Sequence, residues 1–208
     1  MPVILTAQNL PSQDTLGLKN AIDSLATSKT QITEESKTQI NELTKYGFKN
    51  LFNNLEYNSS KPYKTQINPN AESYMQDYLL KNTSSLNNLK KSGVLYFNFI
   101  DNIFKQYGLP TELKYLAVIE SNLNVNATSW VGAVGPWQFM SNTAREYGLN
   151  VNNKGDERTD YLKSTHAAAN YLIYLYKKLN DWLLVIAAYN GGPVRVNTAI
   201  RKSGSKNF

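Results

Sequence analysis

A glutamate at the end of an apolar helical stripe is the residue of this sequence best suited to acid–base chemistry. Leu113, Leu116 and Glu120 are spaced i, i+3 and i+7, so in a helix they lie on one face. An apolar face is expected to turn toward the protein interior, where ionising a carboxyl group is costly. The pattern therefore predicts a raised pKa for Glu120, as a proton donor in glycosidic bond cleavage requires. The alternative is an ordinary glutamate that points to solvent or pairs with Lys114.

A second group of carboxylates is expected to have a structural role. Asp156, Glu157 and Asp160 lie around Arg158, a pattern typical of ion pairs and a helix cap. Hydrolysing glycosidases generally need two carboxylates. With this group assigned to structure, Glu120 is the single candidate for the acid.

Helical patterns must position these residues. Apolar periodicity and stop signals predict helices over 71–80, 85–91, 94–107, 142–147, 161–179 and 182–189, with another that starts at 110–112. The segment 182–189 is apolar all round, as a buried central helix would be. Residues 122–138 hold Gly132, Gly135 and Pro136 and predict an irregular loop. Because no segment alternates convincingly between apolar and polar residues, we expect a mainly α fold.

The N-terminal segment differs from the rest of the chain in composition and in hydrophobic pattern. Residues 1–60 are polar and rich in Ser, Thr, Asn, Gln and Lys, with only thin apolar periodicity. We therefore expect an arm or linker there that is helical or partly ordered. The alternative, a heptad seam that pairs with another chain, has too few repeats to be favoured. A loop signal at residues 58–62 places the boundary, so a domain is expected over 61–208.

Composition excludes several classes of site. The chain has no cysteine and one histidine, His166, which excludes a disulfide framework, a thiolate metal site and a histidine cluster. We therefore expect no metal and no cofactor. The net charge of +6 suggests an acidic partner or simply favours solubility. The basic residues are scattered and no base-reading motif is present, so no nucleic-acid partner is expected. No run approaches the ~20 apolar residues of a membrane span.

Three ordered segments resemble the catalytic domain of a known enzyme family. They are ELKYLAVIESNLN at 112–124, GAVGPWQFM at 132–140 and WLLVIAAYNGG at 182–192. Together they are similar to the lytic transglycosylases that share the goose-type lysozyme (SLT) fold, within the branch of membrane-bound murein transglycosylase D. The resemblance runs from about residue 70 to residue 203 and implies a lysozyme-like helical domain.

The resemblance also implies a reaction. Lytic transglycosylases cleave the MurNAc–GlcNAc β-1,4 bond of peptidoglycan and form 1,6-anhydro-MurNAc, with the C6 hydroxyl of MurNAc as the nucleophile. A single acid, here Glu120, suffices because the intramolecular attack has a high effective molarity. The alternatives are a water-using muramidase or chitinase on the same fold, and a weakly active wall-binding module.

The first two motifs supply four supporting residues by resemblance. Ser121 follows the catalytic glutamate and shapes its surroundings, or its hydroxyl simply caps the helix. Gly135 and Gln138 match a Gly-x-x-Gln motif, in which the glycine lets a sugar approach and the amide binds an N-acetyl group. Trp137 stacks on a sugar face or, alternatively, fills the core.

The third motif supplies Tyr189 and Asn190. The resemblance implies that the tyrosine hydroxyl orients the carboxyl of Glu120 and that Asn190 supports substrate or loop. His166 lies beside a run of alanines and is expected to be a hydrogen-bonded packing residue.

The family also implies a setting for the chain. The expected partner is the peptidoglycan glycan strand, and the expected location is the periplasm or cell envelope. We expect a monomer, with any signal, lipid anchor or membrane association supplied by a segment outside this chain. Family members continue past residue 208, so the domain is expected to be truncated at its C-terminus.

Overall fold

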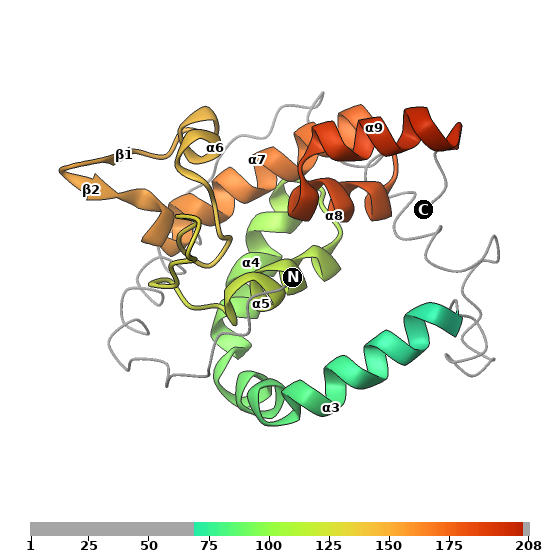
Figure 1. Cartoon of the computed structure of the whole chain (residues 1–208). Helices are drawn as coiled ribbons and strands as arrows, with labels where there is room; N and C mark the ends of the chain where they lie inside the picture. The colour runs from blue at the N-terminus through green and yellow to red at the C-terminus, as the bar shows by residue number, and fades with distance from the viewer. Residues whose placement is uncertain (1–68, 206–208) are drawn as a thin grey trace. The chain divides into compact units, whose positions relative to one another are not determined.

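The computed structural model describes residues 69–205. It is mostly helical, which confirms the expected mainly α fold. The predicted arm over residues 1–60 and its boundary at 58–62 lie outside the described residues. In chain order the elements are α3 Pro69–Ser92, α4 Val94–Gln106, η3 Thr111–Lys114, α5 Tyr115–Ser121, α6 Ser141–Glu146, β1 Val151–Asn152, β2 Gly155–Asp156, η4 Glu157–Thr159, α7 Tyr161–Leu179, α8 Trp182–Gly191 and α9 Pro193–Ser203 (Figure 1).

The described residues fall into two compact units. The first holds residues 84–170, and the second holds residues 69–83 and 171–205. The division falls within α3 and within α7. The two helical patterns predicted over 71–80 and 85–91 are one continuous helix, α3.

Helix α4 forms much of the core of the first unit. Its buried side chains recur every three to four residues, as one apolar helical face requires: Tyr96, Phe99, Ile100, Ile103 and Phe104. The predicted stop is confirmed, since Gly108 follows the helix with a φ of +65°. The backbone N–H of Leu109 then donates to the carbonyl of Phe104 over 2.9 Å and turns the chain toward η3.

The helical run that leads to Glu120 begins with tighter turns than the sequence suggested. Residues Thr111–Lys114 form a 3₁₀ helix, and the α-helix begins only at Tyr115. It ends at Ser121, because Asn122 and Leu123 adopt left-handed φ values of +53° and +63°. This sharp end leaves Glu120 in the last turn of a short helix.

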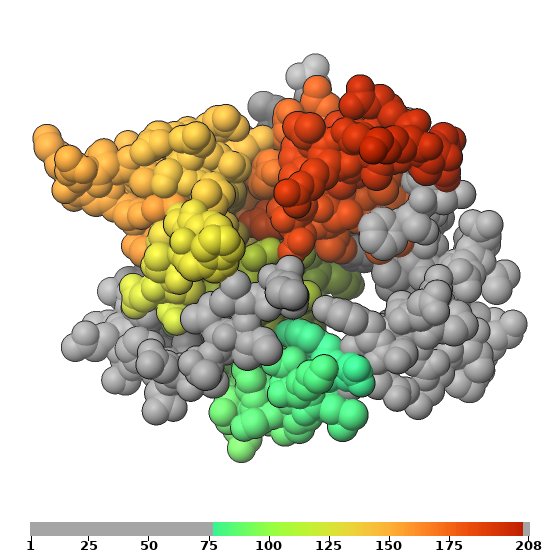
Figure 2. Space-filling model, viewed as in Figure 1, coloured from blue at the N-terminus to red at the C-terminus, as the bar shows by residue number. Residues whose placement is uncertain are grey.

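The loop between α5 and α6 is irregular, as predicted for residues 122–138. It contains tight turns and two isolated antiparallel bridges, which pair Thr128 with Val134 and Val134 with Phe139. The space-filling view shows this part of the chain, in yellow, as a rounded bulge at the surface (Figure 2). Helix α6 follows, and Gly148 closes it with a φ of +87°.

A small antiparallel hairpin was not anticipated. Strands β1 and β2 pair Val151 with Asp156 and Asn152 with Gly155. With two residues in each strand, the hairpin is too short to produce an alternating pattern that the sequence could reveal. It leads through η4 into α7 (Figure 1).

The second unit contains the C-terminal half of α7 together with α8 and α9. Asp181 caps α8, since its carboxylate accepts hydrogen bonds from the N–H groups of Leu183 and Leu184 at 2.8 and 3.1 Å. The helix spans Trp182–Gly191, close to the predicted 182–189, but only one side is fully buried. Helix α9 was not anticipated, and none of its residues is fully buried. None of the helices in residues 69–205 is both long and apolar enough to span a bilayer.

Candidate active site

Glu120 lies in the last turn of α5 and is half-buried. Leu113 and Leu116, which share its predicted face, are buried in the core. Burial penalises the charged carboxylate and raises the pKa of Glu120 to about 7. The predicted rise in pKa is therefore confirmed, and its cause is the loss of hydration.

Lys114 does not serve as the ionic partner of Glu120. Its ammonium group binds both carboxylate oxygens of Asp101, at 2.9 and 2.8 Å. It also lies 5.7 Å from the ring centroid of Phe97 and 5.6 Å from that of Tyr115. These contacts occupy the cation that could have paired with Glu120 and lowered its pKa.

Ser121 connects the end of α5 to the next motif. Its buried hydroxyl lies 2.9 Å from the carbonyl oxygen of Pro136 and 3.1 Å from that of Ala117. A single hydroxyl can therefore bond its own helix or the turn at Pro136. The contact places the residue after Glu120 against the segment that carries Gly135 and Gln138.

Residues 135–138 form a tight turn that closes a small hairpin. The N–H of Gln138 donates to the carbonyl of Gly135 over 3.2 Å, and Val134 and Phe139 exchange two backbone bonds of 3.1 Å. Gly135 has a φ of +86°, and a Cβ added there would lie 2.0 Å from the carbonyl oxygen of Arg158. Glycine is thus required at this position by both backbone conformation and space.

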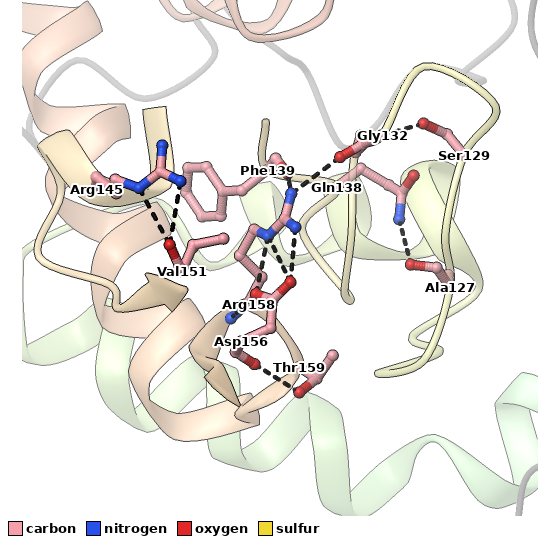
Figure 3. Close-up of polar contacts among 11 residues, drawn as sticks. Ala127, Ser129, Gly132, Gln138, Phe139, Arg145, Val151, Asp156, Arg158 and Thr159 are labelled. Atoms are coloured by element: carbon pink, nitrogen blue, oxygen red, sulfur yellow. Dashed lines mark hydrogen bonds and ion pairs between the residues drawn. The ribbon is translucent and has the colours of Figure 1, made fainter. Parts of the chain in front are cut away.

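The side chain of Gln138 folds back onto its own loop. Its amide nitrogen donates to the carbonyl oxygen of Gly135 at 2.9 Å and to that of Ala127 at 3.2 Å, and Figure 3 shows the second of these bonds. The residue adopts a left-handed φ of +48°. Both amide hydrogens have backbone acceptors, so a further ligand group would meet the amide oxygen as a hydrogen-bond acceptor.

Trp137 belongs to the core. Its side chain has 0% exposure, its indole N–H donates to the hydroxyl of Thr165 over 3.0 Å, and its ring lies 5.6 Å from that of Phe104. This geometry supports the interpretation that Trp137 fills the core and not the one that it stacks on a sugar, because no face of its ring is exposed.

Arg158 holds the loop of residues 132–139 in place. Its buried guanidinium donates to the carbonyl oxygens of Gly132 and Phe139, each at 2.9 Å, and pairs with the carboxylate of Asp156 at 2.6 Å (Figure 3). Hydrogen bonding from Arg158 lowers the pKa of Asp156. The structural ion pair predicted here is confirmed.

The other two carboxylates of this group pair with Lys163. The ammonium group lies 2.6 Å from Glu157 and 3.9 Å from Asp160. Hydrogen bonds from Lys163 and Asn150 lower the pKa of Glu157 to about 2. Asp160 accepts a bond from the N–H of Lys163 over 2.9 Å and so caps α7, as predicted.

Arg158 contacts more distant parts of the chain than its sequence pattern indicated. It was identified only as a partner of nearby carboxylates, whereas it also holds carbonyl groups 26 and 19 residues away. The acceptors are backbone oxygens, which every residue carries, so no residue type at positions 132 or 139 could reveal the contact.

Tyr189 and Asn190 lie in α8, within the second unit. The Tyr189 ring is 5.4 Å from that of Tyr171, and Asn190 is exposed. The predicted approach of the tyrosine hydroxyl to Glu120 stays a prediction. In the first unit, the Nδ1 atom of His166 lies 3.0 Å from the hydroxyl of Tyr107, which confirms its expected role as a hydrogen-bonded packing residue.

Within residues 69–205, no group of three or more acidic, histidine or cysteine side chains is arranged to hold a metal ion. Among the carboxyl groups of the described residues, Glu120 has a pKa raised by burial, and its neighbour Ser121 contacts Pro136 in the turn of residues 135–138.

Comparison with known proteins points to one family. The sequence model described as Transglycosylase SLT domain matches residues 97–208. The membrane-bound lytic murein transglycosylase D of Escherichia coli strain K12 is 38% identical over 128 residues, which is 61% of this chain and 28% of that protein. The protein of the same name from E. coli O6:H1 strain CFT073 has the same identity and coverage.

A third relative has a different name. A protein from Alteromonas sp. strain M-1 named for tributyltin chloride resistance is 36% identical over 112 residues, which is 53% of this chain and 54% of that protein. The chain thus spans 28% of the length of the E. coli relatives and 54% of the Alteromonas one.

Proposed function

The chain belongs to the transglycosylase SLT domain family, and on that premise we propose that it is a lytic transglycosylase acting on peptidoglycan. The bond cleaved is the β-1,4 linkage from MurNAc to GlcNAc. The observation that carries the proposal is the state of Glu120. A carboxyl group with a pKa of about 7 holds its proton in a large fraction of molecules at neutral pH, as a general acid must.

The proposed reaction uses Glu120 twice. Its carboxylic acid first donates a proton to the glycosidic oxygen, so the C1–O bond breaks and the GlcNAc hydroxyl leaves. The C6 hydroxyl of the same MurNAc forms the new bond to C1, and its proton returns to the Glu120 carboxylate. The product is 1,6-anhydro-MurNAc, no water is consumed, and the enzyme is restored.

A single carboxylate is consistent with this scheme. Asp156 is paired with Arg158, and Glu157 is paired with Lys163, and both have lowered pKa values. Their low pKa values leave neither able to act as the acid near neutral pH, and both carboxylates are engaged in ion pairs. The nucleophile of the second step comes from the substrate, which makes a second protein base less necessary.

Supporting roles follow from the positions of the motif residues. The amide oxygen of Gln138 would accept the N–H of an acetamido group, and Gly135 shapes the turn that presents it. Ser121 would hold this turn beside Glu120, and Trp137 would support it from the core. For Tyr189 we propose a hydrogen bond from its hydroxyl to the Glu120 carboxyl, with Asn190 supporting substrate or loop.

The hydrogen bond between Tyr189 and Glu120 has a direct structural test. A crystal structure should place the two oxygen atoms about 2.5–3.0 Å apart or bridge them by one water. A hydroxyl directed to the far side of α8 would exclude the role.

The setting that we propose is the bacterial cell envelope, on its periplasmic side. The partner would be the glycan strand, and the working form a monomer without nucleic acid, metal or cofactor. Dialysis against a chelator should therefore leave activity unchanged. Loss of cleavage that a divalent ion restores would contradict this part of the proposal.

The test of the reaction is mass spectrometry of muropeptides released from purified sacculi. The proposed reaction predicts anhydro products, each lighter by one water than its hydrolytic counterpart. A Glu120→Gln variant provides the blank. Products with a free reducing end would instead identify a hydrolytic muramidase, and no release at all would indicate a wall-binding module.

A further inference from the structure

Trp130 differs from the other tryptophans of this chain. The sequence contains three, all within the described residues. Trp137 and Trp182 have exposures of 0% and 2%, whereas Trp130 has 85%. A tryptophan side chain can bury roughly 150–250 Å². Folding gains little from Trp130, because almost all of that surface remains in water.

The turn that carries Trp130 is held by several hydrogen bonds. The N–H of Ser129 donates to the carbonyl of Ala133 over 2.8 Å, and the N–H of Gly132 donates to the carbonyl of Ser129 over 3.0 Å. The hydroxyl of Ser129 accepts the N–H of Ala133 at 2.9 Å. The indole is therefore presented by a closed turn, and binding through it would require little ordering of the backbone.

Arg158 fixes the same turn to the rest of the first unit. Its buried guanidinium donates to the carbonyl of Gly132 over 2.9 Å, as Figure 3 shows, and the same group binds the carbonyl of Phe139 after the motif turn. One side chain thus sets the position of the turn at Trp130 relative to the turn at Gln138.

The two turns close two isolated antiparallel bridges that share Val134. Val134 pairs with Thr128 on one side and with Phe139 on the other. Residues 129–133 connect the first pair and residues 135–138 connect the second, so successive hairpins reverse direction between them. Trp130 would consequently meet a different part of a bound ligand from the part that meets Gln138.

The surrounding chemistry favours a neutral ligand with an apolar face. Between Glu120 and Arg145 the sequence contains no charged residue. An anionic lipid surface attracts proteins through Lys and Arg, and this loop has neither. The exposed face of an indole suits the C–H face of a pyranose ring, because one is flat and apolar and the other presents apolar hydrogens.

We propose that Trp130 is a stacking platform for a pyranose ring of the glycan strand, at a sugar removed from the bond that is cleaved. The proposal rests on the proposed function, since the ligand is the strand on which Glu120 acts. It assigns this chain an additional sugar-binding position that short substrates do not reach.

The test measures binding in a Glu120→Gln background, so that the strands are not consumed. Titration calorimetry would compare a GlcNAc–MurNAc disaccharide with long glycan strands for three additional variants. Trp130→Ala should weaken binding of long strands roughly tenfold, or about 1.4 kcal/mol, and change disaccharide binding little. Trp130→Tyr should retain most of the affinity. Tyr174→Ala, which removes an exposed aromatic ring from α7, should have no effect.

Three outcomes would overturn the proposal. They are equal long-strand affinity of the Trp130→Ala variant and its parent, failure of the parent to bind long strands, and Trp130-dependent binding to phosphatidylglycerol vesicles instead of glycan. The proposed function is tested separately by the products of the unsubstituted protein. Trp130-dependent binding without anhydro products would sink the function alone, and anhydro products with unchanged binding would sink this inference alone.

Discussion

At the end of α5 burial raises the pKa of Glu120 to about 7, whereas just before α7 cations lower the pKa values of Asp156 and Glu157. The two regions belong to the same compact unit and contain the same kind of side chain. They differ in the partner that each carboxyl finds. Separated pKa values of this kind are a general mark of acids and bases with different roles.

The comparison also separates chemistry from support. Arg158 is held by Asp156 and in turn holds the carbonyl groups of Gly132 and Phe139. Asp156, whose pKa is lowered, thus helps to maintain the loop beside Glu120, whose pKa is raised. Substitutions in the two regions should therefore fail in different ways.

The largest effect is expected from Glu120→Gln. Loss of a general acid–base group typically lowers the rate by ~10²–10⁴-fold, and in the proposed reaction one group performs both proton transfers. Muropeptide release from sacculi would measure the loss, with melting curves to show that the fold is kept. The matched control is Glu157→Gln, which removes a paired carboxylate and should leave the rate unchanged. Equal losses of cleavage rate in both variants would show that the two carboxyl groups do not have the different roles assigned to them.

Gly135→Ala should produce the next largest effect, on stability. A non-glycine residue at φ +86° costs about 1–3 kcal/mol, and the new Cβ would also lie 2.0 Å from the Arg158 carbonyl oxygen. Gly132→Ala is the matched control, since it has the same φ and no atom within 4 Å of its Cβ. Denaturant titrations should show a larger loss for Gly135→Ala. If both variants lose the same stability, the carbonyl oxygen of Arg158 does not limit the space at position 135.

The pH dependence of stability gives a smaller effect. Folded Glu120 has a pKa of about 7 against an ordinary value of 4.5, so between these values the folded state binds more protons than the unfolded state. Stability should therefore fall as pH rises through this window. Glu120→Gln removes the charge and should be more stable than the unsubstituted protein by roughly 1–3 kcal/mol at about pH 8. Below about pH 4.5 the difference should vanish. A difference independent of pH would contradict the assigned pKa.

The smallest effect is expected from Lys163→Met. Lys163 is exposed and its ion pair with Glu157 lies at the surface, where such pairs contribute little to stability. The melting temperature and cleavage rate should stay unchanged, while the pKa of Glu157 should rise toward its ordinary value, because the hydrogen bond from Lys163 is the largest cause of its lowering. NMR titration would measure that shift. A clear loss of activity would mean that this region does more than support the loop.

Local patterns in the sequence determined the elements whose signals lie within a few residues. The buried face of α4, its end at Gly108 and the cap of α7 at Asp160 were predicted because helix periodicity and capping depend on residues three or four apart. The raised pKa of Glu120 was predictable for the same reason, since its stripe ends in a carboxyl. Helix α9 was missed because it buries no residue fully, and β1 and β2 because they are too short.

Tertiary contacts decided which of two residues of the same type is buried and which carboxylate forms an ion pair. Trp130 and Trp137 lie seven positions apart in one loop, yet one is exposed and the other is enclosed by Phe104 and Thr165. Lys114 pairs with Asp101 and not with Glu120, because α4 places the Asp101 carboxylate 2.8 Å from its ammonium group. Neither outcome follows from residue type, because burial and ion pairing depend on which distant segments the fold brings together.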